Sequence, residues 1–60
     1  MTKKIEIKDW ACKHTTFIYT AAMEPLGYIH CEAAVAWRAY KADGSFIDEF
    51  TSKKAAKAAL

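Results

Sequence analysis

WRAYKADGSFIDEF, residues 37–50, decides the fold class because it predicts a β-hairpin. Asp43-Gly44 stands between two runs that are rich in aromatic and aliphatic side chains. An Asp-Gly pair in that setting is a strong hairpin signal, because a type I′ turn needs positive φ at both central residues. The stretch therefore indicates an antiparallel sheet.

The register of this hairpin has two solutions. A two-residue loop makes the cross-strand pairs Trp37–Phe50 and Arg38–Glu49. A three-residue loop with Gly44 in a bulge makes instead the pairs Arg38–Asp48 and Tyr40–Phe46. All of these pairs are favourable on a pleated surface, so the sequence does not choose between the two registers.

The stretch before the hairpin, Tyr28–Lys41, fits two structures because alanine suits either. At a period of two, one long strand has an apolar face of Ile29, Cys31, Ala33, Val35, Trp37 and Ala39. At a period of 3.6, Ala33, Ala36, Trp37 and Tyr40 form a helical stripe. The hairpin that follows favours the strand, and the helix over 30–42 stays the alternative.

Two further strands and one helix are expected on either side. Lys3–Trp10 alternates charged residues with Ile5 and Ile7, which is typical of a strand with one dry face, and His14–Ala22 is rich in β-branched and aromatic residues. Pro25 and Gly27 predict a loop over 23–28. Residues 53–60 follow a capping hydroxyl and predict a helix that docks Ala55, Ala56, Ala59 and Leu60 on the sheet and leaves its lysines in water.

These elements predict a single α+β domain over residues 1–60. Its antiparallel sheet has three to four strands, in the order β-β-β-β-α, and the C-terminal helix packs on one face. A domain of 60 residues buries only about 60% of the surface that its unfolded chain exposes, so a large enclosed active site is not expected. Every apolar run is interrupted by charge or proline, which predicts no membrane contact, and the sparse cysteines favour the reducing cytoplasm.

The cysteines and histidines form two short clusters, Cys12-Lys13-His14 and His30-Cys31. Adjacent residues on a strand point to opposite faces, and neither cluster has the ligand gap of a structural zinc site, so no metal or other cofactor is expected. We expect Cys31 to be a small buried residue and Cys12 an exposed free thiol. No catalytic residue is identified, because an orienting group and an oxyanion hole are missing from the pattern.

Aromatic residues are numerous for this length, eight in 60. One short helix covers one face of a small sheet, so some of these aromatics should be exposed on the other. By strand parity Tyr40 shares a face with Arg38 and Tyr28, away from Trp37, and one of the two sets should line the open face. Aromatic residues and arginine are enriched in binding hot spots. The candidate interface residues are Tyr28, Trp37, Arg38, Tyr40 and Phe46.

The first hypothesis is therefore a non-enzymatic binding and regulatory protein of the inhibitor or adaptor type. Its partner is another protein or a second copy in a homodimer. Its size suits the small regulators that phages and other mobile elements encode.

The alternative hypothesis is nucleic-acid binding. Lys53, Lys54 and Lys57 would contact phosphates from one side of the helix, while Tyr28 or Tyr40 would stack on bases. The net charge of +2 is too small to decide for this hypothesis by itself.

Overall fold

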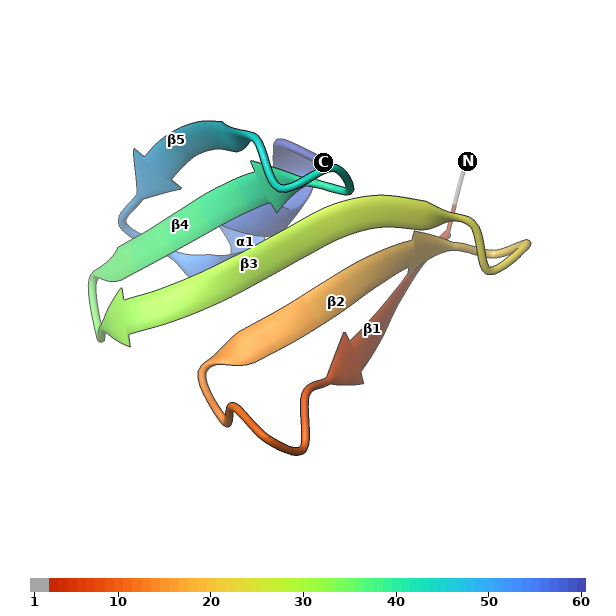
Figure 1. Ribbon diagram of the computed structural model, residues 1–60. Helices are drawn as coiled ribbons and strands as arrows, with labels where there is room; N and C mark the ends of the chain where they lie inside the picture. Colours follow the sequence, from red (N-terminus) through yellow and green to blue (C-terminus); the bar gives the residue numbers. More distant parts are fainter. Residues whose placement is uncertain (1–2) are drawn as a thin grey trace.

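The computed structural model describes residues 3–60 as one antiparallel sheet with a short helix behind it (Figure 1). The strands follow each other in the sheet in chain order, each paired with the next. They are β1 (Lys4–Lys8), β2 (Thr15–Thr20), β3 (Pro25–Ala33), β4 (Ala36–Lys41) and β5 (Phe46–Phe50), and the helix is α1 (Lys53–Ala58). The predicted antiparallel sheet with a C-terminal helix is confirmed, but the sheet has five strands rather than three to four.

The additional strand arises inside Tyr28–Lys41, which forms neither one long strand nor a helix. A turn at Ala34 and Val35 divides it, and Ala33 pairs with Ala36 across that turn. The turn contains no Gly, Pro, Asn or Asp, which are the usual turn residues. The pairing register shifts by one residue between Cys31 and Ala33, so the alternation of β3 is interrupted just before the turn.

The segment that was predicted as a loop over 23–28 is also different. Pro25 begins β3, where a missing N–H does no harm, and the turn lies earlier, at Ala21–Glu24. Gly27 is buried within the strand, and a Cβ there would overlap the carbonyl oxygen of Tyr40. Glycine is therefore required by the close approach of β3 and β4.

The β4–β5 hairpin combines the two predicted registers. Gly44 has φ +94° and its N–H donates to the Lys41 carbonyl, so the turn is the three-residue form and Tyr40 pairs with Phe46. A bulge between Ala39 and Tyr40 then shifts the register by one residue. Beyond this bulge the pairs are those of the two-residue form, Trp37–Phe50 and Arg38–Glu49.

The helix packs over β3, β4 and β5 and is capped as predicted. The Ser52 hydroxyl accepts a hydrogen bond from the Ala55 N–H, which satisfies one of the free donors of the first turn. The helix ends at Ala58, and Ala56 is its one buried residue, while Leu60 packs on the core from beyond its end. The fully buried apolar residues are Ile18, Ile29, Ala39 and Ala56.

Candidate functional site

The face of the sheet opposite α1 carries no covering element among residues 3–60 (Figure 1), and we call it the open face. Cross-strand partners point to the same side of a sheet, so the strand registers assign residues to it. From β1 to β5 they are Ile5, Ile7, Thr15, Phe17, Tyr19, Tyr28, His30, Arg38, Tyr40, Phe46 and Glu49.

Four aromatic rings cross the open face side by side, one from each of β2, β3, β4 and β5. We call Phe17, Tyr28, Tyr40 and Phe46 the aromatic row. The ring centroids are 5.8 Å apart for Phe17 and Tyr28, 4.9 Å for Tyr28 and Tyr40, and 5.6 Å for Tyr40 and Phe46. These are favourable distances for aromatic pairs. Phe46 is 56% exposed, and the other three rings are half-buried.

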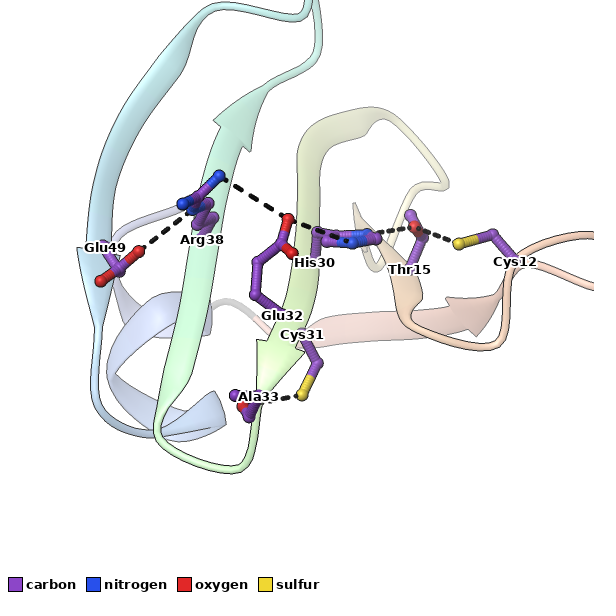
Figure 2. Close-up of polar contacts among 8 residues, drawn as sticks. All are labelled: Cys12, Thr15, His30, Cys31, Glu32, Ala33, Arg38 and Glu49. Atoms are coloured by element: carbon purple, nitrogen blue, oxygen red, sulfur yellow. Dashed lines mark hydrogen bonds and ion pairs between the residues drawn. The ribbon is translucent and has the colours of Figure 1, made fainter.

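A chain of polar contacts crosses the sheet from the loop before β2 to β5 (Figure 2). It begins at Cys12, whose sulfur accepts a hydrogen bond of 3.2 Å from the Thr15 hydroxyl. The same hydroxyl lies 2.9 Å from Nδ1 of His30, and Nε2 of His30 lies 3.5 Å from Glu32. The open face therefore has an apolar part and a polar part, set side by side.

The polar chain ends on an arginine between two carboxylates. Arg38 lies 3.6 Å from Glu32 and donates from Nε to Glu49 at 3.0 Å. The hydrogen bond to Glu49 is the main reason that the pKa of Arg38 is raised above its ordinary value. These charges nearly balance, so the polar part of the open face presents no strong field of either sign.

The structure brings four of the five candidate interface residues together. Tyr28, Arg38, Tyr40 and Phe46 share the open face, as strand parity predicted for the first three. Trp37 lies on the other face, where it pairs with Phe50 and packs against the core.

Sequence reasoning did not identify the share of β1 and β2 in this surface. Ile5 and Ile7 were expected on a dry face, yet they lie on the open face and Ile7 is 40% exposed. Phe17 belongs to the aromatic row because it pairs with Tyr28. The pairing between neighbouring strands places these residues on the open face, and this pairing cannot be read from the alternation within one strand.

The lysines of α1 lie on the side of the sheet away from the aromatic row, and two of them form ion pairs. Lys53 and Lys57 lie 2.7 and 2.8 Å from the two carboxylate oxygens of Glu6 in β1. Hydrogen bonds from both ammonium groups lower the pKa of Glu6 below its ordinary value. The expectation that the helix lysines all remain in water is therefore wrong for these two, while Lys54 is exposed.

The cysteine and histidine clusters are placed differently from expectation. Cys31 lies beside His14, whose carbonyl accepts its N–H. Both cysteines are free and half-buried, so Cys12 is less exposed than predicted and Cys31 is less buried.

The part of the chain that the structure describes contains no group of three potential metal ligands and no pocket. It also lacks a helix of the length and apolar character needed to cross a membrane. Comparison with protein-family models, with curated proteins and with solved structures found no match to this chain.

Proposed function

We propose that this protein is a non-enzymatic binding protein that recognises a protein surface through the open face. The inhibitor or adaptor type of regulator fits this mode of action, because such a protein needs a recognition surface and no chemistry of its own.

The observation that carries the proposal is the aromatic row. Apolar residues from all five strands meet on one uncovered face, with Ile5 and Ile7 at one edge and Phe46 at the other. Exposed apolar patches of this kind on a small protein mark an interaction surface. The polar chain beside the row supplies the kind of polar rim that surrounds the apolar centre of an interface.

A protein partner suits this face better than a nucleic acid because of where the lysines lie. Single-stranded nucleic acid needs stacking rings and cations along one path. Here Tyr28 and Tyr40 are on the open face, whereas Lys53 and Lys57 are on the opposite side and paired with Glu6. The polar chain beside these rings has Arg38 next to the carboxylates of Glu32 and Glu49, a combination that does not attract phosphates.

Site-specific photocrosslinking in living cells tests the proposal. A photoreactive phenylalanine analogue at Tyr28, in the middle strand of the open face, is compared with the same analogue at the exposed Lys54 on the helix. We expect discrete protein adducts from position 28 that are absent from position 54. The same adducts from both positions, or nucleic-acid adducts from position 28 alone, would contradict the proposal.

A second variant keeps the test specific. Trp10 is an aromatic residue outside the sheet, in the loop between β1 and β2, and it is 99% exposed. Adducts from position 28 should persist when Trp10→Ser is added and should disappear when Phe46→Glu is added. The opposite result would move the binding site to the loop.

A further inference from the structure

The fold has an unusually small core for the aromatic residues that it carries. Two of the four fully buried apolar side chains are alanine. The larger rings of the aromatic row lie outside, on the open face. The helix has six residues and contacts β3, β4 and β5, so it adds little burial over β1 and β2.

Small domains compensate for a thin core in a few known ways. Below about 70–80 residues they use disulfides, a structural metal, or association with another chain. In the described part of this chain both cysteines are free, and no three metal ligands come together. Association with another chain is a further way, and the open face is the apolar surface that it would bury.

The area of the open face reaches the lower end of what a specific interface needs. The five strands together have 31 residues, which gives the sheet a flat area of about 490 Å² at about 3.3 Å per residue and about 4.8 Å between strands. Specific interfaces bury at least about 1,000 Å² in total, and two such faces together offer about that area. One copy of the face therefore offers the area of a small interface with a second copy.

The charges of the open face also suit a second copy. A twofold interface places the same patch on both subunits, so a patch of one sign repels its copy. On this face Arg38 lies between Glu32 and Glu49, 3.6 and 3.0 Å away, and both signs are present side by side. Two such faces meet without a strong repulsion.

We infer that the open face binds a second copy of this chain, so that two sheets pack face to face in a twofold dimer. The aromatic rows of the two copies form the centre, and the polar chains lie at the rim. Packed sheets are about 10 Å apart, which leaves room for one interdigitated layer of side chains. This inference rests on the proposed function, because it names the partner of the same face.

Sedimentation equilibrium across a wide range of protein concentration tests the dimer. We expect a mass of twice 6.7 kDa and a melting temperature that rises with concentration. Phe46→Glu should weaken the dimer at least tenfold, because it puts two carboxylates into the apolar interface. The 56% exposure of Phe46 lets one copy accept the change without unfolding. Trp10→Ser, which removes an exposed ring outside the sheet, should leave the dissociation constant unchanged.

A second measurement does not depend on variants. In a mixture of isotope-labelled and unlabelled protein, nuclear Overhauser effects between copies should join rings of the aromatic row. A monomer at every concentration overturns the inference, and so does a dimer that joins the copies through β5 edges or through α1.

The outcome also separates this inference from the proposed function. A monomer that still gives protein adducts from position 28 overturns the dimer alone. A dimer whose only adducts are with itself supports the dimer and removes the inhibitor or adaptor function.

Discussion

Glu6 in β1 forms ion pairs with the helix, and its replacement by glutamine measures how much these ion pairs stabilise the fold. The carboxylate pairs with Lys53 and Lys57 at 2.7 and 2.8 Å. Partly exposed ion pairs contribute about 0.2–1 kcal/mol each. Because all three side chains reach solvent, we expect Glu6→Gln to lower the free energy of unfolding by about 1 kcal/mol, or the melting temperature by about 4–8 °C.

The loss should depend on pH in a defined direction. The two ammonium groups hold the pKa of Glu6 below its ordinary value of 4.5. A carboxyl group with a lower pKa in the folded state stabilises the fold above its unfolded pKa, and this contribution is lost as the pH falls through the folded pKa. The difference in unfolding free energy between wild type and Glu6→Gln is therefore full at neutral pH and shrinks once the pH falls below 4.5.

Urea unfolding followed by tryptophan fluorescence, at neutral pH and at about pH 3, gives this difference directly. Glu24→Gln is the matched control, because Glu24 is exposed and has no ion pair within residues 3–60. Added salt should reduce the effect of Glu6→Gln, since it screens exposed charges. A difference that persists in acid, or a control variant that loses as much stability, would refute the conclusion that the ion pairs of Glu6 stabilise the fold.

Three other results are expected. Gly27→Ala should lower the free energy of unfolding by about 1–3 kcal/mol in urea titrations, because its Cβ would overlap backbone of β4; Gly44→Ala, where the Cβ would make only an ordinary contact of 3.8 Å with the Tyr28 hydroxyl but φ is +94°, should lose only about 1 kcal/mol. A double-mutant cycle on Tyr28 and Tyr40, each changed to Ser, should give a coupling of about 0.5–1.5 kcal/mol in monomeric protein, and a coupling near zero would mean that the rings do not stack in solution. Mixed-sequence single-stranded DNA should produce no fluorescence change at low salt, whereas salt-sensitive binding would restore the nucleic-acid alternative.

The parts of the fold that the sequence predicted are those with local chemical signals. Asp43-Gly44 predicted the last hairpin because glycine accepts a positive φ, and Ser52 predicted the start of the helix because its hydroxyl caps the first turn. The bulge between Ala39 and Tyr40 has no such signal. It shifts the pairing by one residue, which explains why the two predicted registers both occur.

The turn at Ala34 and Val35 was missed for a related reason. Its two residues have no turn preference, and Val35 is 69% exposed at its tip. The pairing of Cys31 with Trp37 holds the turn from outside, helped by a hydrogen bond of 3.2 Å from the Trp37 indole to the Ala34 carbonyl. Tertiary contacts thus specify a turn that local preference does not.

The candidate site was predictable as two alternatives and not as one. Strand parity correctly separates Tyr28, Arg38 and Tyr40 from Trp37. Which set is covered depends on where the helix docks, and that is decided by how well Ala56 and Leu60 fit against Ile29 and its neighbours. Trp37 packs against the same core as the small Ala56, on the covered face.

The orientation of β1 extends the open face to the edge of the sheet. Its charged residues face the helix side, where Glu6 meets Lys57 and the Lys4 ammonium donates to the Lys57 carbonyl at 2.9 Å. Since successive side chains on a strand point to opposite faces, Ile5 and Ile7 must then lie on the open face. A partner that covers the apolar surface has to reach from β1 to Phe46 in β5. A second sheet spans that width, whereas a single helix, about 10–12 Å across, would leave part of the surface exposed.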